Sequence, residues 1–129
     1  MRGTGIVIGV VDDGLEWGHD DLKTNYESNF DYDYCNYDSD PTPVGRDAHG
    51  TAAAGVAAAT GNNGLGVSGA APNASLAGLM LIACGNSDLD ESNALSHLNN
   101  DIDIYSNSWG PSDNGNTLSG PGPLMIAAF

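Results

Sequence analysis

The chain has 129 residues, enough for one domain or for part of a larger one. Three basic residues against 17 acidic ones give a formal net charge of −14. Because this charge repels phosphate backbones, it argues against a nucleic-acid partner, whereas it attracts cations. High solubility accounts for the same charge equally well.

The sequence gives little information about compartment. No stretch reaches the roughly 18 apolar residues that a membrane helix needs. Residues 1–4 run directly into an apolar strand and lack the apolar core of a signal peptide. Cys35 and Cys84 are able to form one bridge, but two cysteines do not make a disulfide framework.

The first expected element is a strand over residues 5–11, a continuous run of apolar, mostly β-branched side chains typical of a buried parallel strand. Asp13-Gly14 follows with turn chemistry. Residues 25–46 are polar, aromatic and acidic, and Pro41 and Pro43 interrupt them. We expect mostly surface loop there, with one short strand at most.

Residues 48–60 predict a helix, because alanine, which has the highest helix propensity, fills most of this stretch. Its small side chains allow close approach to a sheet. Gly55 costs about 1 kcal/mol in a helix interior relative to alanine, so we expect close packing to require it. Residues 61–69 are rich in glycine and asparagine and predict a loop.

The alternation of strand and helix continues to the end of the chain. Residues 74–83 and 102–106 predict two further strands, and residues 90–99 predict a helix with an acidic first turn. Another helix begins within residues 121–129. Alternating strands and helices predict an α/β fold with a mainly parallel sheet.

Polar side chains follow the expected strands at their carboxyl ends, where open α/β sheets bind ligands. Asp12 ends the first strand, Ser108-Trp109-Gly110 follows the third, and His49 begins the alanine-rich helix. A plain turn and a structural histidine explain these residues taken one at a time. Together, Asp12 and His49 are two members of an Asp/His/Ser charge system. No serine in the sequence stands in a recognisable nucleophile context.

Five motifs in order resemble those of the subtilisin-like serine proteases, the subtilases. They are Val11-Asp12-Asp13-Gly14-Leu15-Glu16, His19-Asp20-Asp21-Leu22, His49-Gly50-Thr51, Asn62-Asn63-Gly64 and Tyr105-Ser106-Asn107-Ser108-Trp109-Gly110-Pro111. The double aspartate and the Ser-Trp-Gly-Pro run resemble the kexin/furin-type proprotein convertases. The resemblance implies a three-layer α/β fold with a mainly parallel sheet between helices. It also implies that residues 1–129 are the N-terminal portion of the catalytic domain, truncated at both ends.

By this resemblance, Asp12 is the triad aspartate and His49 is the general base, with the serine beyond this chain. Asp13 resembles a residue that selects a basic substrate side chain in the second specificity pocket. Ser108-Trp109-Gly110 resembles the edge strand that pairs with the substrate backbone. Asp113 matches an acidic residue of the first specificity pocket, although a solvated turn explains it equally well.

Three departures from the family pattern weaken the expectation of basic substrates. Ser112 and Ser119 stand where convertases carry carboxylates. Arg46 lies in a stretch where the family is acidic.

The resemblance also implies a structural calcium ion. Asp21, the side chain of Asn63 and the carbonyl groups of Thr60, Leu65 and Val67 match the ligands of a family calcium site. Calcium takes six to eight oxygen ligands, and a Gly/Asn-rich loop can direct several carbonyls inward. Without Asp21 and the family context, an ordinary turn explains this loop.

The sequence therefore predicts a serine endopeptidase acting on peptide or protein substrates, with processing after basic residues as one form of that activity. The family implies a secreted or extracytoplasmic protein. The alternative is a catalytically inactive relative that binds peptides or only keeps the fold. Because the nucleophile is missing from it, this chain alone is expected to be inactive.

Overall fold

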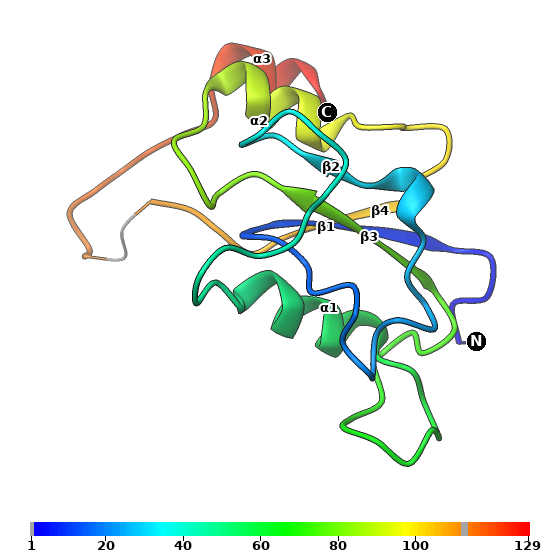
Figure 1. Ribbon diagram of the computed structural model, residues 1–129. Coiled ribbons are helices and arrows are strands. Elements are labelled where there is room, and N and C mark those ends of the chain that lie inside the picture. The colour runs from blue at the N-terminus through cyan, green and yellow to red at the C-terminus, as the bar shows by residue number, and fades with distance from the viewer. Residues whose placement is uncertain (1, 112–113) are drawn as a thin grey trace.

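The computed structural model describes residues 2–111 and 114–129 (Figure 1). Within these residues, four strands form one parallel sheet in the order β2-β3-β1-β4. The two central strands are buried along nearly their whole length, as their continuous apolar runs require. The strands are β1 (Val7–Asp12), β2 (Tyr32–Asp33), β3 (Ser75–Met80) and β4 (Ile104–Asn107).

Helices cover both faces of the sheet. Helix α1 (His49–Ala58) lies against one face, and α2 (Asp88–Leu95) and α3 (Pro123–Ala127) lie together over the other (Figure 1). A short 3-10 helix, η1 (Ser28–Phe30), precedes β2. The predicted three-layer α/β fold with a parallel sheet between helices is therefore confirmed.

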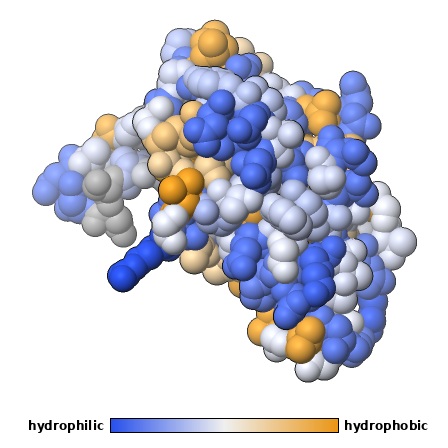
Figure 2. Space-filling view, in the orientation of Figure 1, coloured by the Kyte–Doolittle hydropathy of each residue, from blue (hydrophilic) through white to orange (hydrophobic). Residues whose placement is uncertain are grey.

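Alternating side chains of β1 divide the core into two clusters. Ile8 and Val10 pack with Ala54 and Ala58 of α1, whereas Val11 packs with Ala94 of α2 on the other side. This alternation is the period of two that a strand imposes on its side chains. The surface seen in Figure 2 is largely hydrophilic with separate apolar patches, in keeping with the acidic composition.

The helix boundaries differ from the predicted ones where capping side chains set them. Helix α2 begins two residues before the predicted range, because the Ser87 hydroxyl accepts the Asp90 N–H at 3.2 Å. The Asp90 carboxylate accepts the Ser87 N–H at 3.0 Å in return, which completes a capping box. No helix among the described residues has the length and apolar character needed to cross a membrane.

The short strand allowed for within residues 25–46 is present as β2, but the prediction of surface loop is wrong for the central part of this stretch. Asp31, Asp33 and Tyr34 are buried against β3. Asp31 Oδ1 accepts the Gly78 N–H at 2.7 Å, and the Tyr34 N–H donates to the Met80 carbonyl at 2.8 Å. The Asp31 carboxylate thus accepts an N–H of β3 that a neighbouring strand would otherwise bond. This hydrogen bond explains why a charged side chain is buried beside β3.

The expectation that close packing requires Gly55 is also wrong. A Cβ atom added at Gly55 would meet nothing within 4 Å. The helix approaches the sheet at Gly50 instead, where an added Cβ would overlap the Gly14 carbonyl oxygen and lie 2.8 Å from Asp12 Cβ. Close approach therefore occurs at the start of α1, directly beside His49.

Cys35 and Cys84 form a disulfide across 49 sequence positions. It joins the residues after β2 to the segment after β3. The two cysteines, whose state the sequence left open, are therefore a cross-link between two strand ends.

Candidate active site

The carboxyl end of β1 and the first turn of α1 bring Asp12 and His49 together. His49 Nδ1 lies 2.8 Å from Asp12 Oδ1 and 3.0 Å from Asp12 Oδ2. The Asp12 side chain is 1% exposed, whereas that of His49 is 58% exposed. One edge of the imidazole is thus held by a buried carboxylate while the ring remains accessible to reacting groups.

Asp12 changes the basicity of His49. The hydrogen bond from His49 to Asp12, together with the charge of that carboxylate, raises the pKa of His49 above its ordinary value of 6.5. Since a carboxylate only accepts, Nδ1 carries the hydrogen in this contact, which leaves Nε2 as the free acceptor of the neutral ring. This arrangement suits a base that takes a proton at Nε2.

Backbone contacts fix the position of Asp12. The Asp13 N–H donates to Asp12 Oδ1 at 2.8 Å. The Asp12 carbonyl oxygen accepts the N–H groups of Leu81 and Ile82 at 2.9 and 3.2 Å. The carboxylate therefore has little freedom to leave the histidine.

Asp13 holds the first turn of α1 in place. Its Oδ2 accepts the His49 N–H at 3.1 Å, and its Oδ1 accepts the Gly50 N–H at 2.7 Å. A carboxylate at a helix N-terminus satisfies free N–H groups and interacts favourably with the helix dipole. Sequence reasoning missed this contact, since it joins residues 36 positions apart. The substrate-binding role of Asp13 stays a prediction.

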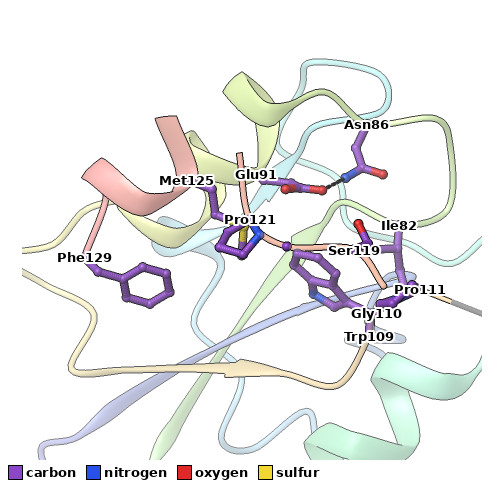
Figure 3. Close-up of a pocket in the computed structure, with 11 residues that line it drawn as sticks. Ile82, Asn86, Glu91, Trp109, Gly110, Pro111, Ser119, Pro121, Met125 and Phe129 are labelled. Atoms are coloured by element: carbon purple, nitrogen blue, oxygen red, sulfur yellow. Dashed lines mark hydrogen bonds between the residues drawn. The ribbon is translucent and has the colours of Figure 1, made fainter. Parts of the chain in front are cut away.

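Ser108-Trp109-Gly110 follows the end of β4, and its Trp109 and Gly110 line a pocket of about 750 Å³, here called the pocket of Trp109 (Figure 3). Ser108 and Gly110 are exposed, and Trp109 is half-buried, facing the space enclosed by Ile82, Pro121 and Met125. Strand β4 pairs with β1 with Asn107 opposite Val11, so Ser108 follows at the end of β1 that carries Asp12. Ile82 of the pocket wall also donates its N–H to the Asp12 carbonyl oxygen at 3.2 Å. The structure thus places the predicted substrate-binding segment beside the predicted catalytic pair.

Glu91 is a pocket residue that the sequence did not reveal. It comes from α2, lines the pocket opposite Trp109, and its Oε1 accepts a hydrogen bond from the Asn86 amide at 2.6 Å (Figure 3). In the sequence it belongs to an acidic first helical turn, which indicates only helix stabilisation. Ser119 also lines the pocket, whereas Asp113 and Ser112 lie outside the described residues.

The Gly/Asn-rich loop after α1 surrounds Asp21. Asp21 Oδ1 accepts from the Asn63 amide at 2.6 Å, and Oδ2 accepts the Val67 N–H at 2.8 Å. These two hydrogen bonds hold the pKa of Asp21 below its ordinary value. The Asp21 carbonyl oxygen also accepts the Thr60 N–H at 2.9 Å. The structure therefore brings Asp21, Asn63, Thr60 and Val67 into one neighbourhood.

Several oxygen groups of this loop fit a calcium ion. Asp21 is buried, and the Thr60 hydroxyl is buried without a hydrogen-bond partner in the described structure. Asn63 offers an amide oxygen, which here accepts the Leu65 N–H at 3.0 Å. Among the described residues no group of three or more His, Cys, Asp or Glu side chains is placed to hold a metal. Most ligands would therefore be carbonyl oxygens, and those of Thr60, Leu65 and Val67 stay predictions.

Fold and site together define an α/β domain with an aspartate–histidine pair at the carboxyl edge of a parallel sheet. The chain belongs to the Subtilase family, whose sequence model matches residues 3–128.

Curated relatives of this chain include animal processing proteases. Furin-like protease 2 of Drosophila melanogaster is 47% identical over 130 residues, which cover 98% of this chain and 8% of the relative. Proprotein convertase subtilisin/kexin type 4 of Homo sapiens is 44% identical over 133 residues, covering 100% of this chain and 18% of the relative. The resemblance to the kexin/furin-type branch is therefore confirmed.

Solved structures of bacterial proteases share the fold. The serine protease of Aeromonas sobria has a TM-score of 0.81 at 31% identity, covering 98% of this chain and 22% of that one. A protease of Pseudoalteromonas arctica has a TM-score of 0.81 at 25% identity and covers 98% of this chain and 46% of its own. The chain spans 8% to 20% of the curated relatives.

Proposed function

We propose that the protein is a serine endopeptidase in which Asp12 and His49 are two members of the catalytic triad. The hydrogen-bonded pair at the carboxyl end of β1, in a chain of the Subtilase family, is the observation that carries this proposal. A serine hydroxyl is too weakly acidic to attack an amide unaided, so a base must accept its proton.

The contacts of His49 support a role for it in each step of the proposed reaction. His49 Nε2 takes the proton of the attacking serine, and the buried Asp12 carboxylate stabilises the resulting imidazolium. His49 then returns that proton to the leaving amine, and an acyl-enzyme remains for water to hydrolyse. The serine, and an asparagine that stabilises the oxyanion, are expected downstream of this chain.

The substrate is a peptide that pairs with the segment after β4. In the described residues, β4 is bonded to β1 alone, and Ser108-Trp109-Gly110 continues from it beside the pocket. A peptide bound as an added strand presents its backbone to such an edge and alternate side chains to the pockets.

A basic side chain of the substrate is the best match for the pocket of Trp109. Glu91 supplies a carboxylate on the pocket wall, and the net charge of −14 attracts cationic peptides. In a series of peptides with arginine or alanine at each position, Glu91→Gln should lower the preference for arginine at one position by roughly tenfold. An unchanged preference at every position would contradict this use of Glu91.

A structural calcium ion and an extracytoplasmic location complete the proposal. Asp21, Asn63 and the Thr60 hydroxyl would hold the ion, which would fix the loop against Asp21 and the end of α1. The Cys35–Cys84 bridge supports a secreted or extracytoplasmic protein, because disulfides persist in oxidising compartments.

Replacement of His49 tests the activity. In the full-length protein, His49→Ala should lower the kcat for peptide cleavage by roughly a million-fold, the order found for a triad histidine. Val56→Ala, which shortens an exposed side chain of the same helix, is the matched control and should leave the rate near normal.

Near-normal turnover by the His49→Ala variant would contradict the assignment of His49 as the general base. A full-length reading frame without a Gly-Thr-Ser nucleophile motif would favour the alternative of an inactive, peptide-binding relative.

A further inference from the structure

One wall of the pocket of Trp109 is the connection between β3 and α2. Ile82 and Asn86 of this connection line the pocket, with Cys84 between them (Figure 3). The position of residues 82–86 therefore helps to set the shape of the pocket.

Few non-covalent contacts hold the middle of this connection. The Ile82 N–H donates to the Asp12 carbonyl, and the next capping contacts begin at Ser87. Among the described residues, the backbone of residues 83–86 makes no hydrogen bond. Cys84, Gly85 and Asn86 are exposed, and a Cβ atom added at Gly85 would meet nothing within 4 Å. Without a further tie, this wall would be free to move.

The disulfide holds this connection through Cys35, whose own surroundings are fixed by hydrogen bonds. Cys35 follows Tyr34, whose N–H donates to the Met80 carbonyl of β3 at 2.8 Å. Its own N–H donates to Oδ1 of the buried Asp33 at 2.6 Å. The bridge therefore connects the weakly bonded centre of the wall to the edge of the sheet.

The same segment orients the acidic group of the pocket. Asn86, two residues after Cys84, donates to Glu91 Oε1 at 2.6 Å. A shift of residues 84–86 would withdraw this donor and release the carboxylate to other rotamers. The bridge thus acts on the charged part of the pocket, whereas Ile82 is held by its bond to Asp12 and by packing against the core.

We infer that the Cys35–Cys84 disulfide is a positioning device for substrate selection, holding Asn86 in place and, through Asn86, the carboxylate of Glu91. This inference rests on the proposed function. A bridge that only stabilised the fold would change the melting temperature and the fraction of active molecules, but not the choice between substrates.

The test compares two peptides in the full-length protein, before and after loss of the bridge. The two peptides differ at one position only, where one has arginine and the other alanine. This is the position at which Glu91→Gln lowers the preference for arginine. The bridge is removed by the double variant Cys35→Ser, Cys84→Ser, and separately by mild reduction of the folded wild-type protein at the exposed Cys84. Rates are expressed per active site, counted with a fluorophosphonate probe. Ala58→Gly in α1, on the opposite face of the sheet, controls for lost stability alone.

The arginine-to-alanine ratio of kcat/KM should fall on the order of tenfold in both bridge-free forms, while cleavage of the alanine peptide per active site changes by less than about twofold. Ala58→Gly should keep the wild-type ratio. An unchanged ratio in the bridge-free forms would overturn the inference, even with a lower melting temperature. If the wild-type protein cleaves neither peptide, the proposed function itself is overturned.

Discussion

In the proposed proton transfer, the exposed His49 would carry the proton, and the buried Asp12 would stabilise the charge that His49 acquires. Asp12 is shielded from water and held by the Asp13 N–H, so its charge acts on the histidine with little screening. The imidazole projects from the first turn of α1, which Asp13 anchors from the other side. A change of either aspartate should therefore alter the position or the basicity of His49.

The pH dependence of cleavage reports the Asp12–His49 contact. Only neutral His49 can accept the serine proton, so kcat/KM should rise as pH increases through the pKa of His49, which Asp12 places above 6.5. Asp12→Asn removes the charge that favours the imidazolium, so the midpoint should move to lower pH. The plateau should also fall by roughly ten thousand-fold. A pH–rate profile from 5 to 9 in which the variant keeps the wild-type midpoint would contradict the contact's role.

Two glycines of α1 should respond to alanine with opposite signs. Gly50→Ala forces a Cβ against the Gly14 carbonyl oxygen and Asp12, and should cost about 1 to 3 kcal/mol of unfolding free energy. Gly55→Ala meets open space in a helix interior and should stabilise by about 0.5 to 1 kcal/mol. Thermal melting of the two full-length variants measures both changes. Equal shifts of one sign would contradict the close approach at Gly50.

At the scale of elements, apolar runs and alanine content were enough to predict β1, β3 and α1. These elements depend on local propensity and on burial of continuous segments. Burial of the central part of residues 25–46 was not predictable in this way. Asp31 is buried because its carboxylate accepts the Gly78 N–H, and Gly78 is distant in the sequence. The capping role of Asp13 and the pocket position of Glu91 also depend on contacts between separate elements.

Calcium should stabilise the loop around Asp21 in the full-length protein. An ion that binds only the folded state at 100 times its Kd adds about 2.7 kcal/mol, so excess calcium should raise the melting temperature relative to a chelator. Asp21→Asn should abolish this rise. Asp20→Asn is the matched control, because Asp20 is exposed and paired with Lys23 at 2.6 Å, and it should keep the rise. The same wild-type melting temperature with calcium and with chelator would contradict the site.

At the scale of the whole molecule, the residues proposed for catalysis and those proposed for substrate binding lie at one edge of the sheet. The carboxyl ends of β1, β3 and β4 carry Asp12, the segment after Met80 and Ser108-Trp109-Gly110. Because the strands are parallel, all three lie on the same side of the sheet. The disulfide joins the segment after β3 to the residues after the neighbouring strand β2. The proposed catalysis and substrate selection would therefore depend on the same sheet geometry.

Labelling with a fluorophosphonate probe tests the proposed activity most directly. The full-length protein should take up one probe per molecule, on a serine that peptide mapping places outside residues 1–129, and His49→Ala should lose this labelling. The 129-residue chain alone should remain unlabelled. A full-length protein that takes up no probe, or a label on a serine within residues 1–129, would contradict the proposal.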